Sequence, residues 1–146
     1  MQRLSLAFCA TALAGMAIAA IPGLAEEAPA RPLTIREIME SVITPASDIL
    51  WAVEDPQSDE DWRALEHAAI ATIAGSVLVA QGGAGPEDDA WASEPEWRAF
   101  NGIMLKAATD GLAAIRARDL DALYNANDAL YPPCEGCHVA FNPGVQ

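Results

Sequence analysis

Apolar side chains recur every three or four residues along most of the chain, which is the period of an amphipathic helix. Four such stretches are predicted, and they begin at Thr34, Ser58, Ser93 and Asp119. Each of these residues belongs to a type that commonly caps a helix, and Glu37 completes a capping box with Thr34. No convincing strand pattern is present. The sequence therefore predicts an all-α fold, an antiparallel four-helix bundle.

The residues expected on the inward faces of these helices share the same spacing. They are Ile35, Ile38, Met39, Val42, Ala46, Ile49, Leu50 and Val53 in the first stretch, Trp62, Leu65, Ala69, Ile73, Ser76, Val77 and Ala80 in the second, Trp97, Phe100, Ile103, Met104, Ala107, Ala108, Leu112 and Ile115 in the third, and Leu120, Leu123, Ala126, Asn127 and Leu130 in the fourth. The large aromatic rings, including Trp51, are expected to pack the bundle.

Prolines and glycines divide the helical pattern. Pro45 is expected to kink the first helix rather than end it, because the apolar period resumes at once. Residues 55–57 and the glycine-rich residues 82–86 are predicted turns, and residues 87–92 are predicted to form a short helical turn. Residues 132–133 are both proline, so the fourth helix is expected to bend or break there.

The N-terminal residues have the layout of a secretory leader. A basic start is followed by an uncharged run from Leu4 to Leu24, and the chain turns acidic after the small residue Ala25. We expect cleavage near Ala25, although the run is also long enough for a retained membrane anchor. The predicted domains are a signal peptide at 1–25, a flexible lead-in at 26–33 and the helical domain at 34–146.

The chain is strongly acidic, with a formal net charge of −13 over its 146 residues. Loss of the leader would remove Arg3 and no acid, which makes the charge one unit more negative. Such a surface repels nucleic acid and anionic membranes. It suits a basic protein partner, and solubility alone is an equally good explanation.

Reactive side chains are concentrated in Cys134-Glu135-Gly136-Cys137-His138, and the third cysteine, Cys9, lies in the predicted leader. A thioredoxin-like redox pair needs a strand–loop–helix context, which is not predicted. A structural zinc site needs four ligands, and His67 is the remaining distant candidate. A disulfide across so short a loop would add little stability. Cys-x-x-Cys-His is also the signature of covalent haem attachment.

The spacing makes chemical sense for haem. Two thiols three residues apart can add to the two vinyl groups at one edge of a porphyrin. The histidine after the second thiol then lies beneath the ring, where it can bind iron. The linkage also keeps the haem in a small exported protein. The sequence therefore predicts one covalent haem c.

With this motif at the end of an all-helical chain, the sequence resembles the cytochrome c-prime superfamily from about Thr34 to Phe141. The resemblance is specific in the Cys-x-x-Cys-His motif and in the number of helices, and it is loose elsewhere. It implies a four-helix bundle in the bacterial periplasm. It also implies thioether links at Cys134 and Cys137, with His138 as the proximal iron ligand.

The resemblance extends to the other side of the iron, which the first helix covers in that superfamily. Low-spin members carry a methionine there, so Met39 is the expected sixth ligand, and its thioether would raise the reduction potential. Met104, which fits the pattern of a core filler, and His67 are rivals. Arg36 is the expected contact of a haem propionate. Residues 139–141 lack the basic residue common in the family, which argues against its gas-binding branch.

The function expected from these observations is one-electron transfer. Since no acid–base pair or nucleophile cluster is evident, we expect a carrier rather than an enzyme, with a basic redox protein as partner. The resemblance also allows a homodimer. Two alternatives stay open: a five-coordinate cytochrome that binds NO or CO, and a haem-free helical protein whose cysteines hold a metal ion or a disulfide.

Overall fold

The computed structural model describes residues 31–142, and all of the regular structure in that range is helical. The elements are α1 (Ile35–Ile38), η1 (Met39–Ile43), α2 (Thr44–Trp51), α3 (Asp59–Val79), α4 (Asp88–Ser93), α5 (Pro95–Ala117) and α6 (Leu120–Phe141). The all-α prediction is confirmed. The predicted signal peptide and its cleavage site lie outside the described residues, as does most of the predicted lead-in.

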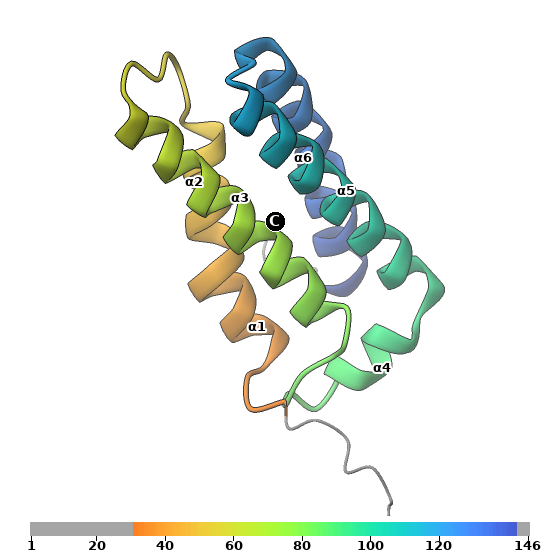
Figure 1. Ribbon diagram of the computed structural model, residues 1–146. Coiled ribbons are helices and arrows are strands. Elements are labelled where there is room, and N and C mark those ends of the chain that lie inside the picture. Colours follow the sequence, from red (N-terminus) through yellow and green to blue (C-terminus); the bar gives the residue numbers. More distant parts are fainter. Residues whose placement is uncertain (1–30, 143–146) are drawn as a thin grey trace, which may run out of the picture.

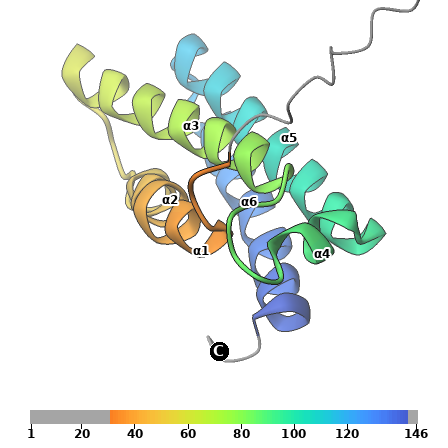
Figure 2. The same cartoon turned by 90° about the horizontal axis from the view of Figure 1, so that it is seen from below.

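The elements α1, η1 and α2 follow one another without a gap, and we call them together the first helix. The first helix packs on α3, α3 packs on α5, and α5 packs on α6 (Figure 1). Figure 2 shows that the first helix and α6 lie on the same side of the α3–α5 pair. Among the described helices, none is both long and apolar enough to cross a bilayer.

Three of the four predicted helix starts are confirmed by their caps. The Thr34 hydroxyl accepts the Glu37 N–H at 3.1 Å, and the Glu37 carboxylate accepts the Thr34 N–H at 2.8 Å. Ser58 and Asp61 form the same reciprocal capping box at the start of α3. The Asp119 carboxylate accepts a backbone N–H in the first turn of α6. These local pairs need no tertiary contact, which is why the sequence reveals them.

The predicted cap of the third helix is wrong. Ser93 is the last residue of α4, and its hydroxyl donates to the Asp89 carbonyl at 2.8 Å. The N-cap of α5 is Glu94, whose side chain makes no capping hydrogen bond. Pro95 forces the residue before it into an extended conformation, so the chain breaks at Glu94. The short helical turn predicted at 87–92 is confirmed as α4.

The first helix passes through Pro45 after a π turn at Met39–Ile43. The extra residue in this turn rotates the helix that follows relative to the predicted face. As a result Ile43 is buried, whereas Ile49, which was predicted to face inward, is 47% exposed. Ile43 packs against Gly75 of α3, where a Cβ atom would overlap its side chain. A close helix contact therefore accompanies the π turn.

Three further apolar residues predicted to face inward are exposed: Val77 on α3, Ala80 at its C-cap and Ile103 on α5. Ser76, which was predicted to face inward, is buried in α3, and so is Val79, which was not predicted to be. The hydroxyl of Ser76 donates to a carbonyl of its own helix at 2.7 Å, so burial leaves it satisfied. A satisfied polar side chain can thus occupy the core while a β-branched neighbour faces outward.

Of the bend or break predicted at the two prolines, the break does not occur, because α6 continues through Pro132 and Pro133 to Phe141. The prolines remove two backbone donors from the helix. Tertiary packing offsets this loss: Pro133 is buried, and the Phe141 ring meets the Trp97 ring edge-on at 5.1 Å between centroids. The Cys-x-x-Cys-His motif is consequently helical.

The connection between α3 and α4 folds around Asp88, an acidic residue that is only 4% exposed. Its carboxylate accepts the backbone N–H of Ile35 at 2.9 Å and that of Gly85 at 2.8 Å. Arg31, in the predicted lead-in, pairs with Asp89 at 2.6 Å. These contacts fix the start of the first helix, one turn before Met39.

Candidate functional site

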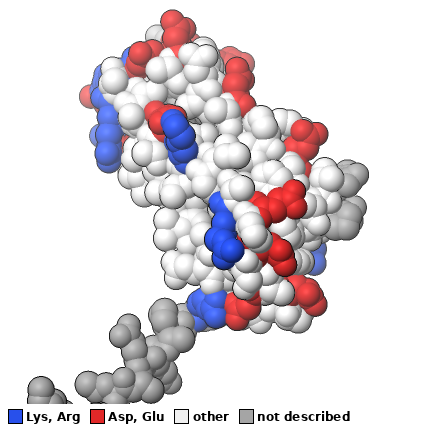
Figure 3. Space-filling model, turned by 90° about the vertical axis from the view of Figure 1, so that its right-hand side faces the viewer, with Lys and Arg blue, Asp and Glu red and all other residues white. Residues whose placement is uncertain are grey.

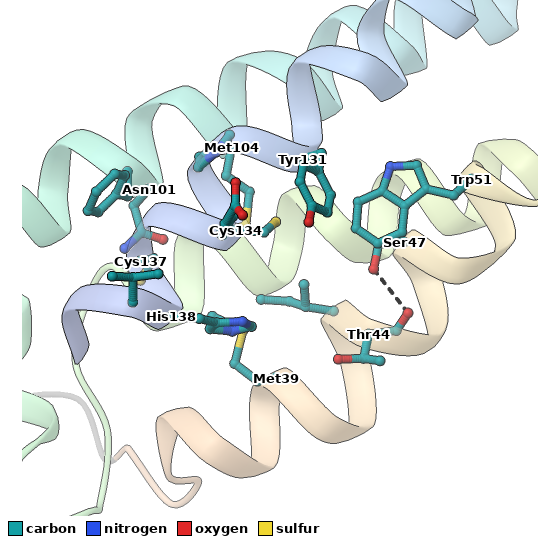
Figure 4. A pocket seen from close by; sticks show the side chains of 15 residues that line it. Met39, Thr44, Ser47, Trp51, Asn101, Met104, Tyr131, Cys134, Cys137 and His138 are labelled. Carbon is teal, nitrogen blue, oxygen red and sulfur yellow. Dashed lines mark hydrogen bonds between the residues drawn. The ribbon is translucent and has the colours of Figure 1, made fainter. Parts of the chain in front are cut away.

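A cavity of about 640 Å³ lies between the first helix and α6, with α5 as its third wall (Figure 4). Its volume is in the range of pockets that hold drug-sized ligands and cofactors. The lining residues are Met39, Ile43, Thr44, Ser47 and Trp51 from the first helix, Phe100, Asn101 and Met104 from α5, and Tyr131, Pro133, Cys134, Glu135, Cys137, His138 and Val139 from α6.

The two expected iron ligands share this cavity. His138 and Met39 project into it from α6 and the first helix, and Figure 4 shows the Met39 side chain directed toward His138. Both residues are half-buried. Both also line a neighbouring cavity of about 250 Å³, together with Cys137 and Arg36. The fold therefore brings together residues that are about 100 positions apart in the sequence.

Hydrogen bonds farther along the helices set the height of this pair. The Asn127 amide donates to the Leu50 carbonyl at 2.6 Å, and the Trp51 indole N–H donates to the Asn127 carbonyl at 3.3 Å. Met39 lies eleven positions before Leu50 on the first helix, and His138 lies eleven positions after Asn127 on α6. Each span is about 16 Å of helix. Because the two helices run in opposite directions, the hydrogen bond between Asn127 and Leu50 places Met39 and His138 at the same position along the helix axes.

Cys134 and Cys137 are free thiols. The Cys134 thiol donates to the Leu130 carbonyl at 3.2 Å, and burial raises its pKa. Cys137 is 8% exposed, and burial, followed by its proximity to Cys134, raises its pKa to about 12. Both side chains are therefore protonated at neutral pH.

The ligands do not converge on a small ion. In residues 31–142 no three Cys, His, Asp or Glu side chains come close enough to share a metal ion, and this applies to Cys134, Cys137 and His138. A structural zinc site needs four convergent ligands.

The glycine inside the motif allows α6 to approach α5. A Cβ atom on Gly136 would lie 2.6 Å from a ring atom of Phe100. Without that Cβ atom the Phe100 ring can pack against the motif and form part of the cavity wall. Gly136 therefore has a packing role that the motif pattern alone does not reveal.

Asn101 is a cavity residue that sequence reasoning missed. It is 6% exposed, and its Nδ2 atom donates to the Trp97 carbonyl at 3.2 Å, but its Oδ1 atom has no partner. A buried acceptor without a donor is costly, so the cavity is suited to an occupant or water that donates a hydrogen bond. The sequence feature that could have revealed it is the position of Asn101, a polar residue within the apolar face of α5.

The remaining candidates differ in position. Met104 is buried on α5 and lines the larger cavity, whereas His67 is exposed on α3 and lines neither cavity. Arg36 lines the smaller cavity, and its guanidinium pairs with Glu40 at 2.8 Å. Of the two methionines, Met39 points toward His138 from the opposite helix (Figure 4). Met104 lies on α5, the helix that packs against α6.

Comparisons with protein-family models, with curated proteins and with solved structures gave no match for this chain. No relative therefore assigns a role to the cavity. Its chemistry is defined by the two thiols, the imidazole and the thioether that line it.

Proposed function

We propose that this chain is a periplasmic c-type monohaem cytochrome that carries single electrons, folded as an antiparallel four-helix bundle. The observation that carries the proposal is the presence of Cys134, Cys137, His138 and Met39 on the walls of one cavity. Two of these residues supply thiols, one an imidazole and one a thioether, which is the donor set of a covalently held, six-coordinate haem.

Each residue has a separate role in this proposal. Cys134 and Cys137 would hold the haem through thioether bonds, and His138 and Met39 would be the ligands of its iron. The haem supplies a one-electron Fe(III)/Fe(II) couple. The soft, neutral Met39 sulfur favours the ferrous state. Arg36 is a candidate contact for a propionate, in competition with its ion pair to Glu40.

The packing around the cavity suits a carrier. Apolar side chains of Ile43, Phe100 and Pro133 limit the access of water to the site. The hydrogen bond from Asn127 to the Leu50 carbonyl limits sliding of the first helix along α6, and this limits rearrangement when the iron changes charge. The smaller cavity beside Met39 leaves room for a gas ligand, so a five-coordinate NO- or CO-binding cytochrome is the second candidate.

Expression of the full chain in cells that attach haem to proteins tests the proposal. We expect a red protein whose peptide mass is raised by one haem and whose pyridine haemochrome spectrum shows two thioether links. The double variant Cys134→Ser/Cys137→Ser should retain no covalent haem. Colourless wild-type protein of unmodified peptide mass from such cells would refute the proposal and favour the haem-free alternative.

A matched pair of methionine variants tests the sixth ligand. Met39→Leu should convert a low-spin spectrum into a high-spin one and open the iron to CO, because leucine has no donor atom. Met104→Leu should leave the spectrum unchanged, since that residue is a wall of the cavity in this proposal. A high-spin spectrum in the wild type, with no change in Met39→Leu, would favour the five-coordinate candidate instead.

A further inference from the structure

The larger cavity has one buried side and one side that faces solvent. Residues on its inner walls, such as Asn101 and Met104, are 6% exposed. On its outer edge Trp51 is 40% exposed, Tyr131 55% and Val139 56%. The rings of Trp51 and Tyr131 meet edge-on across the opening, with centroids 6.2 Å apart. We call this apolar outer edge the mouth of the cavity.

The two helices that border the mouth carry acids and hardly any base. From Met39 to Trp51 the first helix contains no Lys or Arg, and α6 contains none along its whole length. Asp128 and Glu135 share a face of α6 with the mouth residue Tyr131, at spacings of three and four residues. Asp48 lies one turn before Trp51 on the first helix. All three acids are exposed.

Elsewhere on the described surface, several acids are paired with bases. Ion pairs join Arg31 to Asp89, Lys106 to Asp110, Arg116 to Glu66 and Arg118 to Asp59. Figure 3 shows one such face, on which most of the blue basic groups lie beside red acidic ones. In residues 31–142 none of Asp48, Asp128 and Glu135 forms an ion pair, so the mouth combines exposed aromatic rings with acids that no base neutralises.

We propose that the mouth of the cavity is the docking surface for a redox protein with a small apolar patch surrounded by lysine or arginine. This inference rests on the proposed function and names the place where the carrier meets its partner. The exposed rings supply the apolar centre of a transient interface, and Asp48, Asp128 and Glu135 attract the cationic rim of the partner. Electrostatic attraction of this kind acts mainly on the rate of association and weakens with salt.

The test uses the haem-loaded full chain and two charge-reversal variants of equal net charge. The mouth variant is Asp48→Lys/Asp128→Lys. The control variant is Glu60→Lys/Glu87→Lys, whose two acids are exposed and line neither cavity. Reduced protein is mixed in a stopped-flow instrument with tris(phenanthroline)cobalt(III), a cation, or with ferricyanide, an anion. A decalysine peptide, added to the cation reaction, serves as a mimic of the partner surface.

At low ionic strength we expect the mouth variant to react about tenfold more slowly with the cobalt cation and correspondingly faster with ferricyanide. The control variant should change by about twofold or less, although its net charge is the same. Decalysine should slow the cation reaction of the wild type and of the control variant but not that of the mouth variant. Physiological salt should remove most of these differences.

Equal rates for the two variants would overturn the inference, because net charge rather than the mouth would then set the rate. Equal inhibition of both variants by decalysine would overturn it in the same way. Each preparation is first checked for covalent haem by its pyridine haemochrome spectrum. Absence of haem refutes the proposed function, whereas haem with equal rates refutes only the docking surface.

Discussion

The interface between α5 and α6 and the interface between α6 and the first helix are both made by amphipathic helices, yet only the first is closed. Along the closed interface, the Phe100 ring packs against Gly136, and Gly111 lies next to Ala126. Along the open interface the cavity separates the helices, and hydrogen bonds such as that from Asn127 to Leu50 join them beyond it.

The difference shows that the size of the residues decides whether two helices close on each other. Glycine and alanine let two backbones approach, so apolar burial holds α5 and α6 together. Where Met39, Trp51 and Tyr131 project instead, the helices stay apart and enclose a space that a cofactor can fill.

Removal of the ring that closes the α5–α6 interface should have the largest effect. Trp97→Ala is expected to lower the free energy of unfolding by about 3–5 kcal/mol, because Trp97 is 2% exposed and the variant leaves a large cavity. The indole N–H also donates to the Val79 carbonyl at 3.1 Å. Urea unfolding followed by circular dichroism measures the change. Ile103→Ala on the exposed side of α5 is the control and should cost about 0.5 kcal/mol or less.

Gly136→Ala should force the closed interface open. The new Cβ atom would overlap the Phe100 ring, so the ring must turn or α6 must move away from α5. We expect a loss of about 1–3 kcal/mol in the free energy of unfolding. Gly102→Ala is the matched control, since nothing lies within 4 Å of a Cβ atom at that position. It should stabilise α5 by up to about 1 kcal/mol, and equal effects of the two variants would contradict the close approach.

The hydrogen bond between Asn127 and Leu50 across the open interface should contribute less to the free energy of unfolding than Gly136, but more to the position of Met39 opposite His138. Asn127→Ala removes the donor to the Leu50 carbonyl, and we expect it to lower the free energy of unfolding by about 1–2 kcal/mol. In the haem-loaded protein it should also raise the high-spin fraction, because Met39 loses its fixed height opposite His138. Absorption spectra report this fraction. Asn125→Ala, on the exposed side of α6, should change neither quantity.

The smallest effect is expected at the cap before Met39. Hydrogen bonds from the backbone N–H and then the hydroxyl of Thr34 hold the pKa of Glu37 below its usual value. The charged cap therefore stabilises the folded chain above the ordinary glutamate pKa of about 4.3, and this contribution is lost as the pH falls through the lowered pKa.

The Glu37→Gln variant isolates this pH dependence, because glutamine can cap the helix but does not titrate. The melting temperature of the variant should lie slightly below that of the wild type at pH 7, and the gap should shrink toward pH 3. A direct NMR titration of the Glu37 carboxyl gives the pKa itself. A gap that stays constant across this range would show that the charge of Glu37 does not act through the cap.

Much of the local structure was predictable because it depends on neighbours in the sequence. The caps at Thr34, Ser58 and Asp119 are side chains that accept a backbone N–H three residues farther along the chain. The cap at Ser93 was mispredicted because α4 uses that residue and Pro95 moves the start of α5. Of the bend or break expected at Pro132 and Pro133, the break is absent for a different reason, since burial of the helix around the prolines offsets the two lost hydrogen bonds.

The candidate site was predictable in part. Cys134, Cys137 and His138 form a local motif, and Met39 followed from a resemblance rather than from spacing. Asn101 and Tyr131, in contrast, become cavity residues only through the packing of α5 and α6. The π turn at Met39 also escaped prediction, although it determines which residues of the first helix face the cavity.

By itself the sequence determined which segments are helical and where the reactive side chains lie along them, because helix periodicity, capping and motif spacing are short-range properties. Only the tertiary structure decided that the first helix and α6 face each other across a cavity, with Met39 and His138 on its walls. That outcome depends on glycine contacts, a π turn and cross-helix hydrogen bonds between residues far apart in the chain, whose combined geometry has no local signature.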